Sequence, residues 1–124
     1  MTHQRDILIV EDDPSMCELI SMSLRDGGYR VRACTIQTAR SLEGVKVDAV
    51  VVAINSPKAT RGNTIKKLRE LFPSSAFVAT SGYFPASIQA SGGLAAELGV
   101  ERTLPKPFRV DQLLEIVRDL TKGM

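Results

Sequence analysis

Three short runs of apolar residues constrain the fold of this chain more than any other feature. Ile7 to Val10, Ala49 to Ile54 and Ala76 to Ala79 contain only apolar residues. Strands with one face in water alternate polar and apolar residues, whereas strands covered on both faces read as continuous apolar runs. The runs therefore predict the inner strands of a parallel sheet. Two weaker candidates, Tyr29 to Cys34 and Glu101 to Leu104, are expected nearer the sheet edges.

Segments with helical spacing lie between these runs. Pro14 suits the first turn of a helix with Asp13 as its N-cap, and Gly27-Gly28 predicts a left-handed stop. Apolar residues recur every three or four positions in three segments: Met16, Leu19, Ile20 and Leu24; Ile65, Leu68, Leu71 and Phe72; and Val110, Leu113, Leu114, Val117 and Leu120. We therefore expect three amphipathic helices in these segments.

The remaining connections are less regular. Thr35 to Leu42 predicts a short helix, and Lys58 to Gly62 is expected to form a loop. Gly92-Gly93 interrupts a helical pattern from Pro85 to Leu98, where each interior glycine costs ~1 kcal/mol relative to alanine. A shortened or broken helix is expected there. Alternating strands and helices predict an α/β fold, a single open, doubly wound domain over residues 1–124 with helices on both faces of a parallel sheet.

Charge excludes some partner classes. A formal net charge of +2 is too small to indicate a nucleic-acid or anionic-membrane partner. Arg61, Lys66, Lys67 and Arg69 cluster, and we interpret them as a solvated helix face. The longest apolar run is far shorter than the ~20 residues of a membrane span, and the first residues lack the apolar stretch of a signal peptide. These features predict a cytoplasmic protein.

Cys17 and Cys34 have no ligand-like spacing. A CxxC pair or a similar short spacing is what metal sites and redox motifs use. We therefore expect both to be reduced, partly buried small hydrophobes.

Polar side chains follow three of the predicted strands. Glu11, Asp12 and Asp13 follow the first strand, Ser81 follows the fourth, and Lys106 follows the fifth. Parallel strands of a doubly wound sheet end at the same edge, where ligands bind. Adjacent carboxylates suit a hard cation such as Mg²⁺, and a hydroxyl and an ammonium opposite them suit a phosphoryl group. Together these positions predict a phosphate-and-metal pocket.

The chain resembles the receiver domain of bacterial two-component response regulators over essentially its whole length. The residues that carry the resemblance are Ile7-Leu8-Ile9-Val10-Glu11-Asp12-Asp13-Pro14 and Leu104-Pro105-Lys106-Pro107-Phe108, supported by Gly27-Gly28-Tyr29 and Ser81-Gly82-Tyr83. The resemblance implies a flavodoxin-like, five-stranded parallel sheet in the order 2-1-3-4-5. It also implies signalling by phosphoryl transfer from a histidine kinase.

The resemblance assigns roles to five positions. Glu11, Asp12 and the backbone carbonyl of Asn55 would hold Mg²⁺. Ser81 and Lys106 would bind the phosphoryl group, and the peptide bond after the lysine would be cis.

Two positions depart from the family pattern. The phosphoacceptor position is Ala53, which has no oxygen to attack phosphorus, and the aromatic switch position is Thr103. Asp48 cannot substitute, because it lies about 16 Å upstream along an extended strand, at the opposite end of the sheet. Ser56 has no identifiable base to activate it. We therefore expect no catalysis from this chain.

The missing aspartate also weakens the metal site, since it removes one of three anionic ligands. We expect Mg²⁺ to bind weakly or not at all. Lys106, without a carboxylate at position 53, is expected to pair with Glu11 or Asp12.

Two functional hypotheses remain open. The first is a pseudo-receiver that acts through phosphorylation-independent protein–protein contacts, as a monomer or weak homodimer without nucleic-acid or membrane binding. Its partners would be a histidine kinase, a phosphotransfer protein or an output protein. By family analogy they would contact the first helix or the face formed by the last two helices and the fifth strand. The second is a conventional Mg²⁺-dependent receiver whose aspartate at position 53 was replaced by mutation. The sequence also leaves open a stand-alone receiver or a piece of a longer regulator.

Overall fold

The computed structural model describes residues 4–54, 58–85 and 93–122. The strands are β1 (Asp6–Val10), β2 (Arg30–Cys34), β3 (Ala49–Ala53), β4 (Ala76–Ser81) and β5 (Arg102–Pro105). The helices are α1 (Pro14–Asp26), α2 (Lys58–Leu71), α3 (Gly93–Leu98) and α4 (Val110–Thr121), with a 3₁₀ turn, η1 (Ala39–Leu42). Within the described residues, no helix has the length and apolarity that crossing a membrane requires.

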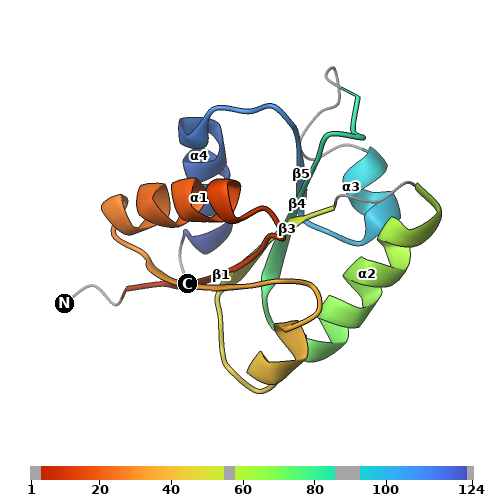
Figure 1. Cartoon of the computed structure of the whole chain (residues 1–124), viewed down its shortest axis with the longest axis horizontal. Helices are drawn as coiled ribbons and strands as arrows, with labels where there is room; N and C mark the ends of the chain where they lie inside the picture. Colours follow the sequence, from red (N-terminus) through yellow and green to blue (C-terminus); the bar gives the residue numbers. More distant parts are fainter. Residues whose placement is uncertain (1–3, 55–57, 86–92, 123–124) are drawn as a thin grey trace.

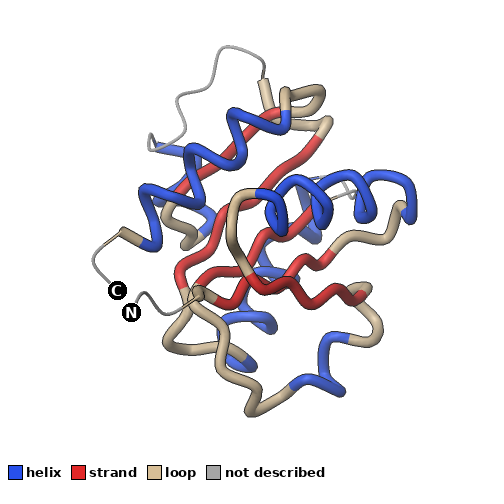
Figure 2. Tube along the Cα trace, turned by 90° about the vertical axis from the view of Figure 1, so that its left-hand side faces the viewer, coloured by secondary structure: helices blue, strands red, loops and turns tan. Residues whose placement is uncertain are grey.

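The five strands form one parallel sheet in the order β2-β1-β3-β4-β5. Figure 2 shows the strands side by side with helices on either side of them. The predicted fold class, strand order and edge positions of β2 and β5 are therefore confirmed.

Each face of the sheet has its own layer of helices. α1 and α4 cover one face, whereas η1, α2 and α3 cover the other (Figure 1). Ile7 and Ile9 of β1 pack under α1 and α4, and Leu8 and Val10 pack on the opposite face. All four are fully buried, which explains why β1 reads as a continuous apolar run.

α1 begins and ends as predicted. The Asp13 carboxylate accepts hydrogen bonds from the backbone N–H groups of Ser15 (3.0 Å) and Met16 (3.4 Å). After the helix, Gly28 has a φ of +98°, the left-handed conformation that favours glycine. The backbone of Gly27 has the right-handed helical conformation, which any residue can adopt. A Cβ at this position, however, would lie only 2.8 Å from a methyl of Leu114. The glycine pair therefore serves both the turn and the packing of α1 against α4.

Two predicted connections were wrong in part. Only Ala39–Leu42 of the helix expected from Thr35 is helical, as a 3₁₀ turn. The Thr38 hydroxyl accepts the Thr35 backbone N–H at 2.9 Å, an alternative to helical bonding. The backbone from Lys58 to Gly62, expected as a loop, instead forms the start of α2.

Gly93 is the first residue of α3, which has only six residues. This short helix agrees with the predicted interruption, although Gly92 lies outside the described residues. Cys17 and Cys34 are free and partly buried, as predicted.

Arg69 does not belong to a solvated face. Its guanidinium contacts both carboxylate oxygens of Glu101 (2.6 and 2.8 Å) and donates to the carbonyls of Ser75 (2.9 Å) and Gly99 (3.0 Å). It also lies over the ring of Phe77, 4.6 Å from the ring centre. The arginine therefore joins the end of α2 to β4 and the start of β5, and the prediction of a solvated side chain was wrong there.

Candidate functional site

Four strand ends bring the predicted site residues to one edge of the sheet. Glu11 follows β1, Ala53 ends β3, Ser81 ends β4 and Lys106 follows β5. The strands are in register at this edge, where Ala53 pairs with Thr80. The convergence expected from a doubly wound sheet is therefore present.

Glu11 and Lys106 form a largely buried ion pair at this edge. The Lys106 ammonium donates to Oε1 of Glu11 at 2.9 Å. The Glu11 side chain is 1% exposed and the Lys106 side chain 18%. The other carboxylate oxygen, Oε2, accepts the backbone N–H of Asp13 at 3.3 Å. The predicted pairing of Lys106 with an acidic residue of the first loop is confirmed, and Glu11 is the partner.

The backbone fixes the position of the lysine. The Lys106 N–H donates to the carbonyl of Ser81 at 2.9 Å, which ties the turn after β5 to the end of β4. The peptide bond between Lys106 and Pro107 is cis, as the resemblance implied. The ammonium is thereby held over the same strand ends as Glu11.

Ser81 and Thr103 are both fully buried. The Ser81 hydroxyl accepts the backbone N–H of Tyr83 at 3.0 Å, so one of its lone pairs is used within its own turn. Thr103 pairs with Ala79 in the register of β4 and β5. A threonine inside the sheet replaces the aromatic side chain that the resemblance implies for this position.

Asp12 is exposed and points toward the loop after β2. Its Oδ1 accepts the backbone N–H of Ile36 at 3.2 Å. Sequence reasoning missed this contact, because it depends on the path of the loop and uses only a backbone group of Ile36. Asn55 lies outside the described residues.

The comparisons with known proteins agree with this geometry. The family model of the response regulator receiver domain matches residues 7–118. The chain belongs to this family. A curated relative, the hydrogenase transcriptional regulatory protein HoxA of Bradyrhizobium diazoefficiens, is 29% identical over 121 residues, covering 96% of this chain. The receiver chain spans only about a quarter of that relative, 24% of its length.

Solved structures give the same result for the fold. A response regulator from Thermotoga maritima superposes with a TM-score of 0.79 at 24% identity, over 98% of this chain and 100% of that one. A CheY-like receiver domain from Methylobacillus flagellatus gives a TM-score of 0.75 at 28% identity, over 95% and 99% of the two chains. This chain is thus a receiver by sequence family and by architecture.

The two carboxylates expected to hold Mg²⁺, Glu11 and Asp12, both have partners within the described part of this receiver. Glu11 is neutralised by an ammonium, and Asp12 is turned toward Ile36. No buried side-chain oxygen or nitrogen among the described residues lacks a hydrogen-bond partner. Nor do the described residues contain a group of three or more His, Cys, Asp or Glu placed to hold one. To bind Mg²⁺, which takes oxygen ligands, both carboxylates would have to give up these partners.

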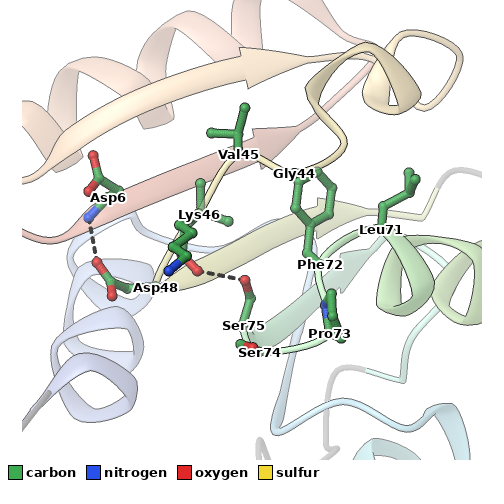
Figure 3. A pocket seen from close by; sticks show the side chains of 11 residues that line it. Asp6, Gly44, Val45, Lys46, Asp48, Leu71, Phe72, Pro73, Ser74 and Ser75 are labelled. Carbon is green, nitrogen blue, oxygen red and sulfur yellow. Dashed lines mark hydrogen bonds between the residues drawn. The ribbon is translucent and has the colours of Figure 1, made fainter.

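Asp48 lies at the opposite edge of the receiver sheet, just before β3. It lines a hollow of about 420 Å³ together with Asp6 and the turn from Leu71 to Ser75 (Figure 3). Its Oδ2 accepts the backbone N–H of Asp6 at 2.8 Å. The interpretation of Asp48 as too distant to replace the acceptor agrees with this position.

Proposed function

We propose that this chain is a pseudo-receiver that works through phosphorylation-independent contacts with other proteins. The observation that carries the proposal is Ala53 at the end of β3, on the same sheet edge as a lysine already paired with Glu11. A methyl group cannot attack phosphorus, and the ammonium that would stabilise a phosphoryl group is occupied by an internal carboxylate.

Thr103 supports the same proposal from the output side. A receiver reports its state by moving an aromatic ring, and the threonine here is fully buried within β5. Input and reporting residues are therefore both changed. We infer that the chain is no enzyme, that Mg²⁺ binds weakly or not at all, and that the protein works in the cytoplasm.

The proposed partners are a histidine kinase, a phosphotransfer protein or an output protein. α1 offers one contact surface, since Leu19 and Met22 are 49% and 56% exposed and lie one helical turn apart. The face formed by α3, β5 and α4 is the other. Charge substitutions on each face, followed by pull-down with a candidate partner, test this part. Binding that is insensitive to substitutions on both faces contradicts it.

A phosphorylation assay tests the core of the proposal. Three proteins are incubated with acetyl phosphate and Mg²⁺: the unaltered chain, Ala53→Asp and the matched control Ala53→Asn. Intact-mass spectrometry then measures phosphoryl incorporation. We expect labelling of Ala53→Asp alone, because only this variant restores a carboxylate nucleophile. Labelling of the unaltered chain refutes the pseudo-receiver.

The alternative is a conventional receiver whose aspartate was replaced by mutation. It is favoured by the retention of Ser81 and Lys106 at the ends of β4 and β5. Sequencing codon 53 of the genomic copy decides between them. An aspartate codon there supports the alternative, and an alanine codon supports the pseudo-receiver.

A further inference from the structure

A hollow between η1 and α2 has the dimensions of a small-molecule site. Its volume is about 620 Å³, and ligand pockets typically measure about 300–1,000 Å³. Its charged lining residues are Arg40 and Lys67, and no carboxylate lines it. The hollow lies on the face of the sheet away from α1 and α4. None of its lining residues belongs to the candidate site at the strand ends.

The sign of its charge sets this hollow apart from the two others described. The hollow at the amino-terminal edge of the sheet contains Asp6 and Asp48 against one lysine. The hollow beside α1 contains Glu11, Asp12 and Glu18 without any basic residue. Of the three, only the hollow between η1 and α2 attracts an anion.

Within the described part of the chain, neither of its two cations is engaged elsewhere. The ion pairs formed among the described residues use other basic side chains, and Arg40 and Lys67 have no side-chain hydrogen bond in that part of the chain. Both are exposed, so they can turn toward a ligand without breaking an internal contact. A guanidinium and an ammonium together match the charge of a dianion, and arginine suits the geometry of a phosphate.

The rest of the lining adds an apolar base and an amide rim. Leu68 is 3% exposed and Ala39 1%, and the side chain of Ile36 continues this apolar surface outward. Gln37 and Asn63 contribute amide groups that can donate or accept hydrogen bonds. A ligand with an apolar body and an anionic group at one end would match this lining. Its anionic group would meet the two cations, and its body would cover the apolar base.

We propose that this hollow binds a small phosphate monoester that carries an aromatic or aliphatic body. The phosphate lies between Arg40 and Lys67, and the body covers the apolar base at Leu68. The two cations fix the orientation, and the apolar contact distinguishes such a ligand from free phosphate.

The hollow is connected to the candidate site through Ile36. The side chain of Ile36 lines the hollow, while its backbone N–H is held by the Asp12 carboxylate at 3.2 Å. A ligand that fixes residue 36 therefore acts on the acidic loop next to Glu11. This gives the chain a chemical input that Ala53 cannot provide. That regulatory role rests on the proposed function, but the binding itself does not.

Titration of ¹⁵N-labelled protein with phenyl phosphate, followed by NMR, tests the binding. We expect saturable shifts in the segments around Ile36–Arg40 and Asn63–Leu68, with smaller shifts at Asp12, whose carboxylate is hydrogen-bonded to the Ile36 backbone. Phenol and inorganic phosphate are titrated separately, and each should bind at least roughly tenfold more weakly, since each makes only half of the contacts. Equal affinity for inorganic phosphate, or no saturation at millimolar phenyl phosphate, overturns the proposal.

Charge reversal localises the site. Arg40→Glu and Lys67→Glu should each weaken phenyl phosphate binding at least about tenfold, because each replaces a charge-assisted contact by repulsion. Lys66→Glu is the matched control, since Lys66 is an exposed neighbour on α2 that does not line the hollow. All three positions are exposed, and the spectrum of each free variant verifies its fold. Equal weakening by Lys66→Glu shows general charge attraction and overturns the proposal. Labelling of the unaltered chain by acetyl phosphate, in contrast, refutes the pseudo-receiver and leaves the binding result intact.

Discussion

The ammonium of Lys106 lies 2.9 Å from Oε1 of Glu11, and the glutamate side chain is 1% exposed. A charge this deeply buried is stable only with its partner, because few water molecules can reach it. Lys106→Met should therefore lower the free energy of unfolding by about 3 kcal/mol. Urea denaturation measures the loss.

A double variant separates the ion pair from packing. Glu11→Gln combined with Lys106→Met removes both charges and should recover most of the stability lost in Lys106→Met. Additive losses in the double variant would mean that the two side chains stabilise the fold independently.

Restoring an aspartate at position 53 should restore metal binding. Ala53→Asp places a third carboxylate among Glu11, Asp12 and Lys106, so the variant should be less stable than the parent without metal. Mg²⁺ should then stabilise it, by about 1.4 kcal/mol at a concentration ten times its Kd. Thermal denaturation with and without Mg²⁺ measures the effect. The parent and Ala53→Asn should not respond, and an equal response of the parent contradicts weak binding.

Burial raises the pKa of the Cys34 thiol from 9.0 to about 11, with smaller contributions from the nearby Cys17 and Asp12. Below pH 9.0 the folded and unfolded chains both keep this proton, but between pH 9.0 and about 11 only the folded chain keeps it. The unfolded state then binds fewer protons, so stability falls as the pH rises through this window. Urea denaturation across the window should show this decrease. The stability of Cys34→Ala should fall less than that of the parent between pH 9.0 and about 11. An equal fall in the two proteins contradicts the assignment to Cys34.

The contact between Arg69 and Glu101 predicts a further loss of stability on substitution. Arg69→Met removes the ion pair in which Nη2 contacts both carboxylate oxygens of Glu101, and it removes two hydrogen bonds to carbonyls. Glu101 still accepts the backbone N–H of Phe77. We expect a loss of about 2 kcal/mol, measured by urea denaturation. Arg102→Met is the matched control, because Arg102 lies 3.8 Å from an exposed Asp119 and should cost less than about 1 kcal/mol. Equal losses in the two variants contradict this difference.

The strands were the most predictable part of the fold. Burial on both faces leaves a direct trace in sequence, and Ile7 to Val10 became β1 with one added residue. β4, in contrast, continues through Thr80 and Ser81. Because these residues are polar, a search for apolar runs ends the strand two residues too early. Lys58 to Gly62 contains no apolar periodicity, so its helical backbone left no signal of that kind.

The candidate site was predictable to the same extent as the strand ends. Topology alone brings Glu11, Ser81 and Lys106 together, because each follows or ends a parallel strand. The choice of Glu11 over Asp12 as the partner of Lys106 was not predictable. It depends on the loop after β2, where the backbone of Ile36 engages Asp12. Every residue type except proline has a backbone N–H, so a contact with this group cannot be recognised from the type of residue in the sequence.

The buried pair also bears on why a receiver with alanine at position 53 would keep Glu11 and Lys106. Replacing Glu11 alone leaves a lysine with its counterion gone, and replacing Lys106 alone strands a carboxylate inside the protein. Every single-step path away from the pair therefore passes through a less stable intermediate, which is sign epistasis imposed by folding. Retention of Glu11 and Lys106 is what selection for a folded chain produces by itself. The presence of Glu11 and Lys106 therefore does not by itself require present phosphoryl transfer.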